Sequence, residues 1–260
     1  MKTTTASALF IGVVLALAGC APSTAPAPAP AESDALAGSI TVFAAASLKA
    51  TFTELASDFE EEHPGTTVEL NFAGSSDLVT QITEGAPADV FASADEKNMT
   101  KVTDAALNEG EPVDFATNVL EIAVPPGNPA GIEGFADLAN SDAKVVICAP
   151  AVPCGAATAT VETATGVDIT PVSEESSVTD VLGKVTSGEA DAGLVYVTDV
   201  IAAGDAVEGI EFDESDEAVN TYPLVALTES ASPDVARAFV EYIASAAGQK
   251  VLAAAGFGTP

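Results

Sequence analysis

Serine residues recur where the sequence changes from a short apolar run to a segment with helical periodicity. Ser47 follows the run "VFAAA" and Ser75 follows "NFAG". Ser177 comes directly before the segment that begins at Val178, and Cys154 opens another helical segment after "KVVICA". Helix starts expose unpaired backbone N–H groups and the positive end of the helix dipole. These positions could therefore bind a small oxyanion without a charged side chain.

Each position alone also has a structural interpretation. Serine is a common N-cap residue and stabilises a helix by about 1 kcal/mol. For a single junction, capping is the simpler interpretation. Four junctions together favour a ligand site more strongly, because α/β sheets gather such junctions at the carboxyl ends of their strands, where ligands bind. Capping and anion binding both remain open on the residues alone.

Residues for the common catalytic sites are sparse. The sequence has a single histidine, His63, which lies in "EEEHPG", a pattern typical of a helix end that turns into a loop. A hydrolase with Ser47 as nucleophile would need this histidine beside a serine at a strand end. No G-x-S-x-G elbow and no Walker glycine loop occur. We therefore expect a protein that is not an enzyme.

Direct cation sites are also poorly supported. The segment "EFDESDEAVN" (211–220) is acidic, but it lacks the Asp/Asn spacing and the closing glutamate of a calcium loop. A solvated turn is the favoured interpretation. Ferric iron would suit the acidic charge and Tyr196 could be a ligand, but no adjacent tyrosine accompanies it. We expect no cofactor and no metal held as a bare cation.

The composition narrows the choice of partner. The formal net charge of the chain is -31, which argues against nucleic acid and anionic lipid as partners. Aromatic residues make up 5% of the chain and tryptophan is absent, so a stacking site for sugars or bases is not indicated. The acidic residues are scattered, which is typical of a solvated surface.

The first residues have the layout of an export signal. Residues 1–19 combine an early lysine with an apolar run that is shorter than the ~20 residues of a membrane-spanning helix. The following "LAGC" resembles a bacterial lipobox, which implies cleavage before Cys20 and lipidation of its thiol. Residues 20–38 are rich in proline and alanine and are predicted to be a semi-rigid linker. We expect an extracytoplasmic protein anchored to the cell membrane through Cys20.

Cys148 and Cys154 bracket the segment "APAVP". Because an exported protein lies in an oxidising environment, the two cysteines are predicted to form a disulfide, with two buried free thiols as the alternative. In the chain-entropy model so small a ring stabilises the fold by only about 2 kcal/mol. Its main role would be to fix the shape of one loop.

Short apolar runs alternate with helical segments from residue 39 onward, which predicts βαβ units and a mostly parallel sheet. Extended segments near 119–125 and 221–227 join two such series and suggest two lobes with two crossovers. The first lobe is predicted to comprise 39–120 plus 224–260, and the second 121–223. The first series has expected strands "SITVFAA", "TTVELNFA" and "ADVFAS" and helices 48–62, 76–84 and 96–106. The second has strands "KVVICA" and "AGLVYV" and helices 155–165, 177–187 and one ending near 203, followed by strand "TYPLVALT" and helices 233–246 and 247–254.

Several motifs together resemble the solute-binding proteins of molybdate ABC transporters. They are "ITVFAAASL", "NFAGSSDL", "QITEGAPADVFASAD", "PCGAAT", "SSVTDVLGKVTSGEADAGLVYVTD" and the closing "AAGFG". The resemblance implies an α/β, two-lobed, periplasmic-binding-protein (Venus-flytrap, class II) fold with mixed sheets and two crossover strands. It also implies a cleft that holds tetrahedral molybdate or tungstate.

The same resemblance assigns the ligand-binding residues. Ser47 and Ser75 match the two serines of the first lobe, and Tyr196 matches a tyrosine whose hydroxyl reaches the oxyanion from the second lobe. Val178 matches a backbone donor at a helix start. Cys154 falls where the family often has an alanine that donates its backbone N–H. Lys49 lies two residues beyond Ser47, and helical geometry is expected to turn it away from the ligand.

The resemblance implies a monomeric protein that captures the oxyanion and delivers it to an ABC permease. Two alternatives remain. One is a binder of another ligand, such as sulfate or ferric iron, and the other is a surface lipoprotein with a protein-interaction role. Molybdate and tungstate are similar in size, so the sequence does not rank them.

Overall fold

Two five-stranded sheets organise residues 36–140 and 142–260, which are the residues described by this computed structural model. The expected signal peptide, Cys20 and most of the expected linker lie outside the described residues. In the described part, no helix is long and apolar enough to cross a membrane.

The first sheet, sheet A, has the strand order β2-β1-β3-β10-β4. Strand β1 is parallel to β2 and β3, whereas β10 is antiparallel to both β3 and β4, so the sheet is mixed. Its strands are β1 (Gly38–Ala45), β2 (Thr66–Ala73), β3 (Val90–Ala92), β4 (Asn108–Asn118) and β10 (Asn220–Leu227).

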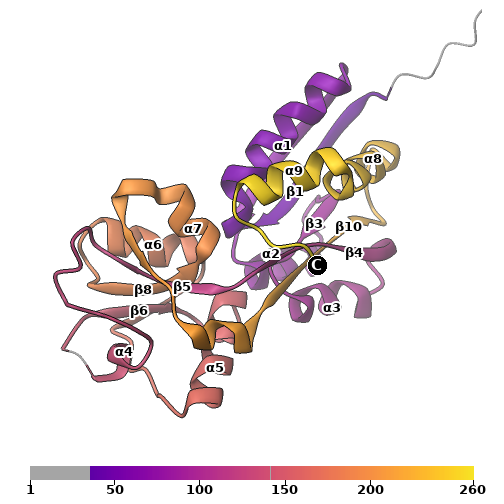
Figure 1. Ribbon diagram of the computed structural model, residues 1–260. Helices are drawn as coiled ribbons and strands as arrows, with labels where there is room; N and C mark the ends of the chain where they lie inside the picture. The colour runs from indigo at the N-terminus through magenta and orange to yellow at the C-terminus, as the bar shows by residue number, and fades with distance from the viewer. Residues whose placement is uncertain (1–35, 141) are drawn as a thin grey trace, which may run out of the picture. The chain divides into compact units, whose positions relative to one another are not determined.

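Helices cover both faces of sheet A because its strands bury side chains alternately on each side. Ile40 and Val42 of β1 pack in a core with α1, α8 and α9, whereas Phe43 packs with α2 and α3 on the opposite face. Figure 1 shows α1, α8 and α9 together beside β1. The helices are α1 (Lys49–Glu62), α2 (Ser75–Thr83), α3 (Glu96–Asp104), α8 (Pro233–Ala244) and α9 (Ala246–Ala254).

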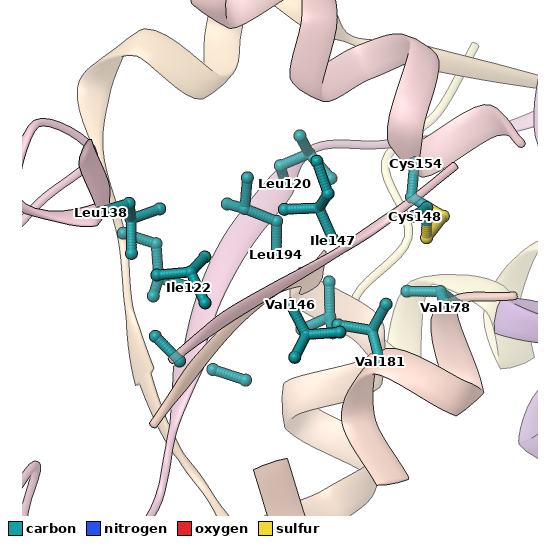
Figure 2. Close-up of a cluster of buried hydrophobic side chains, with 14 of the residues drawn as sticks. Leu120, Ile122, Leu138, Val146, Ile147, Cys148, Cys154, Val178, Val181 and Leu194 are labelled. Atoms are coloured by element: carbon teal, nitrogen blue, oxygen red, sulfur yellow. A yellow bond between two sulfur atoms is a disulfide. The ribbon is translucent and has the colours of Figure 1, made fainter. Parts of the chain in front are cut away.

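The second sheet, sheet B, has the order β7-β6-β8-β5-β9 and is also mixed, with β6 parallel to β7 and β8 and β5 antiparallel to β8 and β9. Figure 2 shows Val146 beside Val181 of α6, and Ile147 on the other side of the same strand. The strands are β5 (Leu120–Val124), β6 (Val145–Cys148), β7 (Ser173–Glu175), β8 (Ala192–Tyr196) and β9 (Glu208–Ile210). The helices are α4 (Asp137–Asn140), α5 (Pro153–Thr165), α6 (Val178–Thr186) and α7 (Val197–Ala203).

The chain crosses between the sheets twice. It leaves sheet A after Asn118 and enters β5 at Leu120, and it returns at Asn220, whose register partner is Asn118. The return therefore begins before the expected boundary at residue 224. Asn220 and Thr221 are polar and give no apolar strand signal, but pairing with β4 extends the strand through them. The two-lobed α/β fold with mixed sheets is confirmed.

The short elements β7, β9 and α4 have no counterpart among the expected elements, and two further segments also differ. Strand β4 was not predicted, because "NEGEPVDFATN" carries acidic residues, a glycine and Pro112; it lies at the edge of sheet A, where proline and charge are tolerated. The acidic segment expected as a solvated turn forms a short 3₁₀ helix at Asp213–Ala218. Ala218 at its end is buried in the core of the second lobe.

Candidate functional site

A small pocket lies where residues of the two sheets meet. Its enclosed volume is about 10 Å³, and all five residues predicted from the sequence line it: Ser47, Ser75, Cys154, Val178 and Tyr196. Ser47 is 8% exposed and the other four residues are at most 3% exposed, so the lobes are closed around the pocket. Sites for drug-sized ligands occupy roughly 300–1,000 Å³. This pocket is therefore suited to a ligand of only a few atoms.

The first lobe contributes two serines, and neither one caps a helix. Ser47 lies inside a 3₁₀ turn, Ala46–Leu48, and its Oγ is 3.0 Å from Tyr222 Oη. Ser75 is the first residue of α2, and its Oγ accepts a hydrogen bond from the Ala94 N–H at 3.0 Å. The capping interpretation is therefore wrong for both residues. This bond uses a lone pair of the Ser75 oxygen, and the hydroxyl proton remains available for donation to a ligand.

The second lobe contributes two helix starts. Cys154 follows Pro153 in the first turn of α5, and Val178 is the first residue of α6. N–H groups in a first turn have no partner within their own helix. Ser177 does cap α6, since its Oγ accepts from the Asp180 N–H at 3.2 Å. At this junction the capping interpretation holds, and Val178 supplies the pocket-facing position.

Tyr196 ends β8, and its hydroxyl is a buried polar group without a partner. Among the described residues, its Oη is the one fully buried side-chain nitrogen or oxygen atom that makes no hydrogen bond. Burial raises the pKa of Tyr196 well above its usual value, and the neighbouring Tyr222 raises it further. The phenol therefore stays protonated at neutral pH. An unpaired buried hydroxyl costs about 1–3 kcal/mol, which a ligand that accepts a bond from it would recover.

Charged side chains surround the pocket but do not line it. None of its lining residues is acidic or basic. Lys49 is exposed on α1 and lines a neighbouring groove instead, as expected from its position. Asp199 is buried behind Tyr196, whose backbone N–H donates to its Oδ2 at 3.0 Å. Burial raises the pKa of Asp199 to about 7, and the hydrogen bond from the Tyr196 backbone N–H opposes this rise. The residues that line the pocket can thus interact with a ligand only through dipoles.

The lobes approach closely at Gly74, directly before Ser75. A Cβ at this position would overlap the carbonyl oxygen of Ser176 and would lie 3.4 Å from Val152 Cγ1. Both neighbours belong to the second lobe. Gly74 has φ -60° and ψ 139°, a conformation open to any residue, so glycine is required here by the contact and not by its backbone freedom.

Cys148 and Cys154 form a disulfide that closes the loop between β6 and α5. Their Cα atoms are 5.6 Å apart, and the loop they enclose carries the pocket residues Val152 and Pro153. A Cβ at Gly155 would overlap the carbonyl oxygen of Ala149, so the helix start packs directly on the loop backbone. The disulfide therefore holds Cys154 against the end of β6.

Removal of this disulfide is expected to lower Tm by roughly 5 °C, because a short ring contributes about 2 kcal/mol and a domain of this size loses about 2–4 °C per kcal/mol. The variant Cys148→Ser/Cys154→Ser, and the wild type in reductant, are compared by calorimetry. Reductant should leave the Tm of the double variant unchanged. A wild-type Tm that is insensitive to full reduction would contradict the role of the ring.

Comparison with known proteins places the chain in a family. The family described as bacterial extracellular solute-binding protein matches residues 40–258. The chain belongs to this family. It is 49% identical, over 86% of both chains, to the molybdate-binding protein ModA of Mycobacterium tuberculosis. It is 29% identical, over 84% of this chain and 85% of the relative, to a putative ABC transporter substrate-binding lipoprotein of Bacillus subtilis.

A solved structure agrees with the sequence relatives. The periplasmic molybdate-binding protein of Azotobacter vinelandii superposes with a TM-score of 0.75 and 25% identity, covering 85% of this chain and 99% of that one. The family is one of solute-binding proteins, and its description places it outside the cell.

Tyr222 and Asn118 lie behind the pocket lining, where Tyr222 Oη contacts Ser47 Oγ and Asn118 donates to Tyr222, and neither was identified from the sequence. Tyr222 reads as an inward-facing residue of the apolar strand "TYPLVALT", and Asn118 ends an edge strand that gave no signal. The one available signal was the hydroxyl of Tyr222 in an otherwise apolar strand. A buried tyrosine hydroxyl usually has a hydrogen-bond partner, so this group indicated a polar contact inside the fold.

Proposed function

We propose that this protein captures molybdate or tungstate in the pocket between its lobes and delivers the ion to an ABC permease. The observation that carries the proposal is the Tyr196 hydroxyl, which is buried at the pocket and has no partner in the described part of the chain. It faces a space that no charged residue lines. An oxyanion would give this donor an acceptor.

The proposed ligand shell consists of neutral donors from both lobes. Ser47 and Ser75 supply hydroxyl groups, Cys154 and Val178 supply backbone N–H groups, and Tyr196 supplies its phenol. Hydrogen bonds to a charged group contribute roughly 1.5–3 kcal/mol each. Five such bonds suffice for tight binding without a counter-cation, and opening of the lobes would break about half of them together.

The donor set does not suit a metal cation. Cations such as ferric iron need carboxylate, phenolate or imidazole ligands, whereas this pocket presents N–H and O–H groups. The residues that the structure describes contain no cluster of three or more His, Cys, Asp or Glu side chains that could hold a metal. The metal would therefore be bound only as the core of an oxyanion, which is cargo and not a cofactor.

Size would decide the selectivity among oxyanions. Sulfate is smaller than molybdate, so donors placed for the larger ion would reach it badly. Each unpaired buried donor costs about 1–3 kcal/mol, and a few of them would weaken sulfate binding by orders of magnitude. Tungstate has nearly the size of molybdate and should compete with it.

The wider assignments are part of the same proposal. A monomer tethered through lipidated Cys20 would hold the binding lobes near a membrane permease, and the proposed linker would provide the reach. The similarity to a protein named as a substrate-binding lipoprotein supports the anchor. The solute-binding relatives and the lack of charged groups in the pocket support a role without catalysis.

Calorimetric titration of ligand-free protein tests the proposal. Molybdate and tungstate are expected to bind with one site per chain, and sulfate, phosphate and Fe(III) to bind far more weakly. At a hundredfold excess over Kd, molybdate should stabilise the fold by about 2.7 kcal/mol, visible as a higher Tm. Preferential binding of sulfate or Fe(III) would replace the proposed ligand, and no response to any of the five would favour a protein-interaction role.

A further inference from the structure

A buried polar chain leads from the pocket to the two crossovers. Ser47 Oγ lies 3.0 Å from Tyr222 Oη, and the Asn118 side-chain amide donates to Tyr222 Oη at 3.5 Å. The same amide donates to Thr198 Oγ1 at 2.7 Å. Tyr222 is 0% exposed, Asn118 5% and Thr198 4%, so water does not compete for these bonds. This series of hydrogen bonds connects Ser47, a pocket residue of the first lobe, to the start of α7 in the second lobe.

The orientation of the Asn118 amide is fixed by its other end. Its Oδ1 accepts from the Val119 backbone N–H at 3.1 Å, and a backbone N–H can only donate. The oxygen of the amide must therefore face Val119, and the nitrogen must face Tyr222 and Thr198. This assignment makes the phenol oxygen of Tyr222 an acceptor from Asn118.

The phenol proton of Tyr222 then has one acceptor. Tyr196 Oη, the hydroxyl of the neighbouring ring, has no partner in hydrogen-bond geometry, whereas Ser47 Oγ lies 3.0 Å from Tyr222 Oη, so we assign Ser47 Oγ as the acceptor. A serine oxygen that accepts this proton keeps its own proton for another partner. Burial raises the pKa of Tyr222, so the phenol does not lose its proton at neutral pH.

We propose that Tyr222 is a positioning residue which, held by Asn118, makes Ser47 a hydrogen-bond donor toward the pocket. Tyr222 does not line the pocket and acts through Ser47. This inference rests on the proposed function, because it concerns the direction in which the same pocket presents its protons. It also explains why an anion would be preferred there, since a serine turned the other way would present lone pairs.

The variant Tyr222→Phe removes the hydroxyl that links Ser47 to Asn118. It keeps the aromatic ring, which packs on Phe115, Tyr196 and Phe257. Molybdate affinity is measured for the wild type, Tyr222→Phe, Ser47→Ala and the double variant. Tyr222→Phe is expected to raise Kd about tenfold in the wild type and by less than about twofold when Ser47 is already alanine. A purely structural role would give the same factor in both backgrounds and would overturn the proposal, as would an unchanged Kd in Tyr222→Phe.

Two further variants complete the test. Tyr242→Phe makes the same chemical change on α8, away from the pocket, and should leave Kd unchanged. Asn118→Asp replaces a donor by an acceptor, so the phenol proton should turn to position 118 and Ser47 should donate to Tyr222 instead. Its Kd is expected to exceed that of Tyr222→Phe. A Kd equal to that of the wild type would contradict the proposed hydrogen-bond arrangement of Asn118, Tyr222 and Ser47.

The proposed function fails separately, if the wild type does not bind molybdate. In that case the same variants are compared with whichever oxyanion of the calorimetric series does bind. If none binds, both the function and the role of Tyr222 are overturned.

Discussion

The double variant Ser47→Ala/Ser75→Ala is expected to bind molybdate roughly 10²- to 10⁴-fold more weakly than the wild type. The two hydroxyls are the side-chain donors of the first lobe, and each bond to a charged ligand contributes roughly 1.5–3 kcal/mol. Calorimetric titration of both proteins measures the change in Kd. An affinity within a factor of about ten of the wild type would show that the ion is held by other groups.

Two controls separate binding from folding in this experiment. The Ala94 N–H loses its acceptor when Ser75 is replaced, which lowers the free energy of unfolding by about 1–3 kcal/mol, so the titrations are made well below Tm. Ser76→Ala changes the next residue of α2, which does not line the pocket, and should leave Kd unchanged.

The variant Gly74→Ala is expected to weaken molybdate binding by at least roughly 10³-fold without preventing folding. Alanine adopts the backbone conformation of Gly74 without strain, but its Cβ would overlap the Ser176 carbonyl oxygen when the lobes meet. The lobes must then stay apart, and the three donors of the second lobe no longer reach an ion held by the first. Losing three charge-assisted bonds accounts for the size of the effect.

Titration and small-angle X-ray scattering measure this outcome together. The wild type should become more compact on adding molybdate, whereas Gly74→Ala should not. Gly134→Ala is the matched control, because Gly134 has open space around its Cβ position and should behave as the wild type. Compaction of Gly74→Ala with wild-type affinity would mean that the contact with Ser176 does not limit closure.

Helices and strands with strong apolar patterns could be predicted from the sequence. Strand segments that are held mainly by backbone hydrogen bonds to a neighbouring strand could not. Strand β1 alternates apolar residues that face two different cores, and β6 is a continuous apolar run between helices. Strand β4 has neither pattern, because an edge strand is held by backbone bonds to β10 and exposes much of its length. The start of β10 was missed for a different reason: β10 is an interior strand, but its first residues, Asn220 and Thr221, are polar and give no apolar signal.

The positions of the site residues could be predicted, but the function of each hydroxyl could not. Ser47 and Ser177 look alike in the sequence, since each stands at a helix start. The structure shows that Ser177 caps its helix and that Ser47 is bound to Tyr222, which lies 175 residues away in the chain. The tendency of a serine to cap a helix depends on neighbouring residues in the sequence. The partner of Ser47 is instead Tyr222, which the second crossover brings next to it from a distant part of the sequence.

The two crossings of the chain lie side by side, because Asn118 and Asn220 are register partners in sheet A. Two adjacent crossover segments form a hinge. The main relative motion that this hinge allows the lobes is rotation about a single axis. If the lobes close on the proposed ligand, the angle of that rotation would report whether the pocket is occupied. A transport protein that touches the rims of both lobes could read this single angle without ever contacting the cargo.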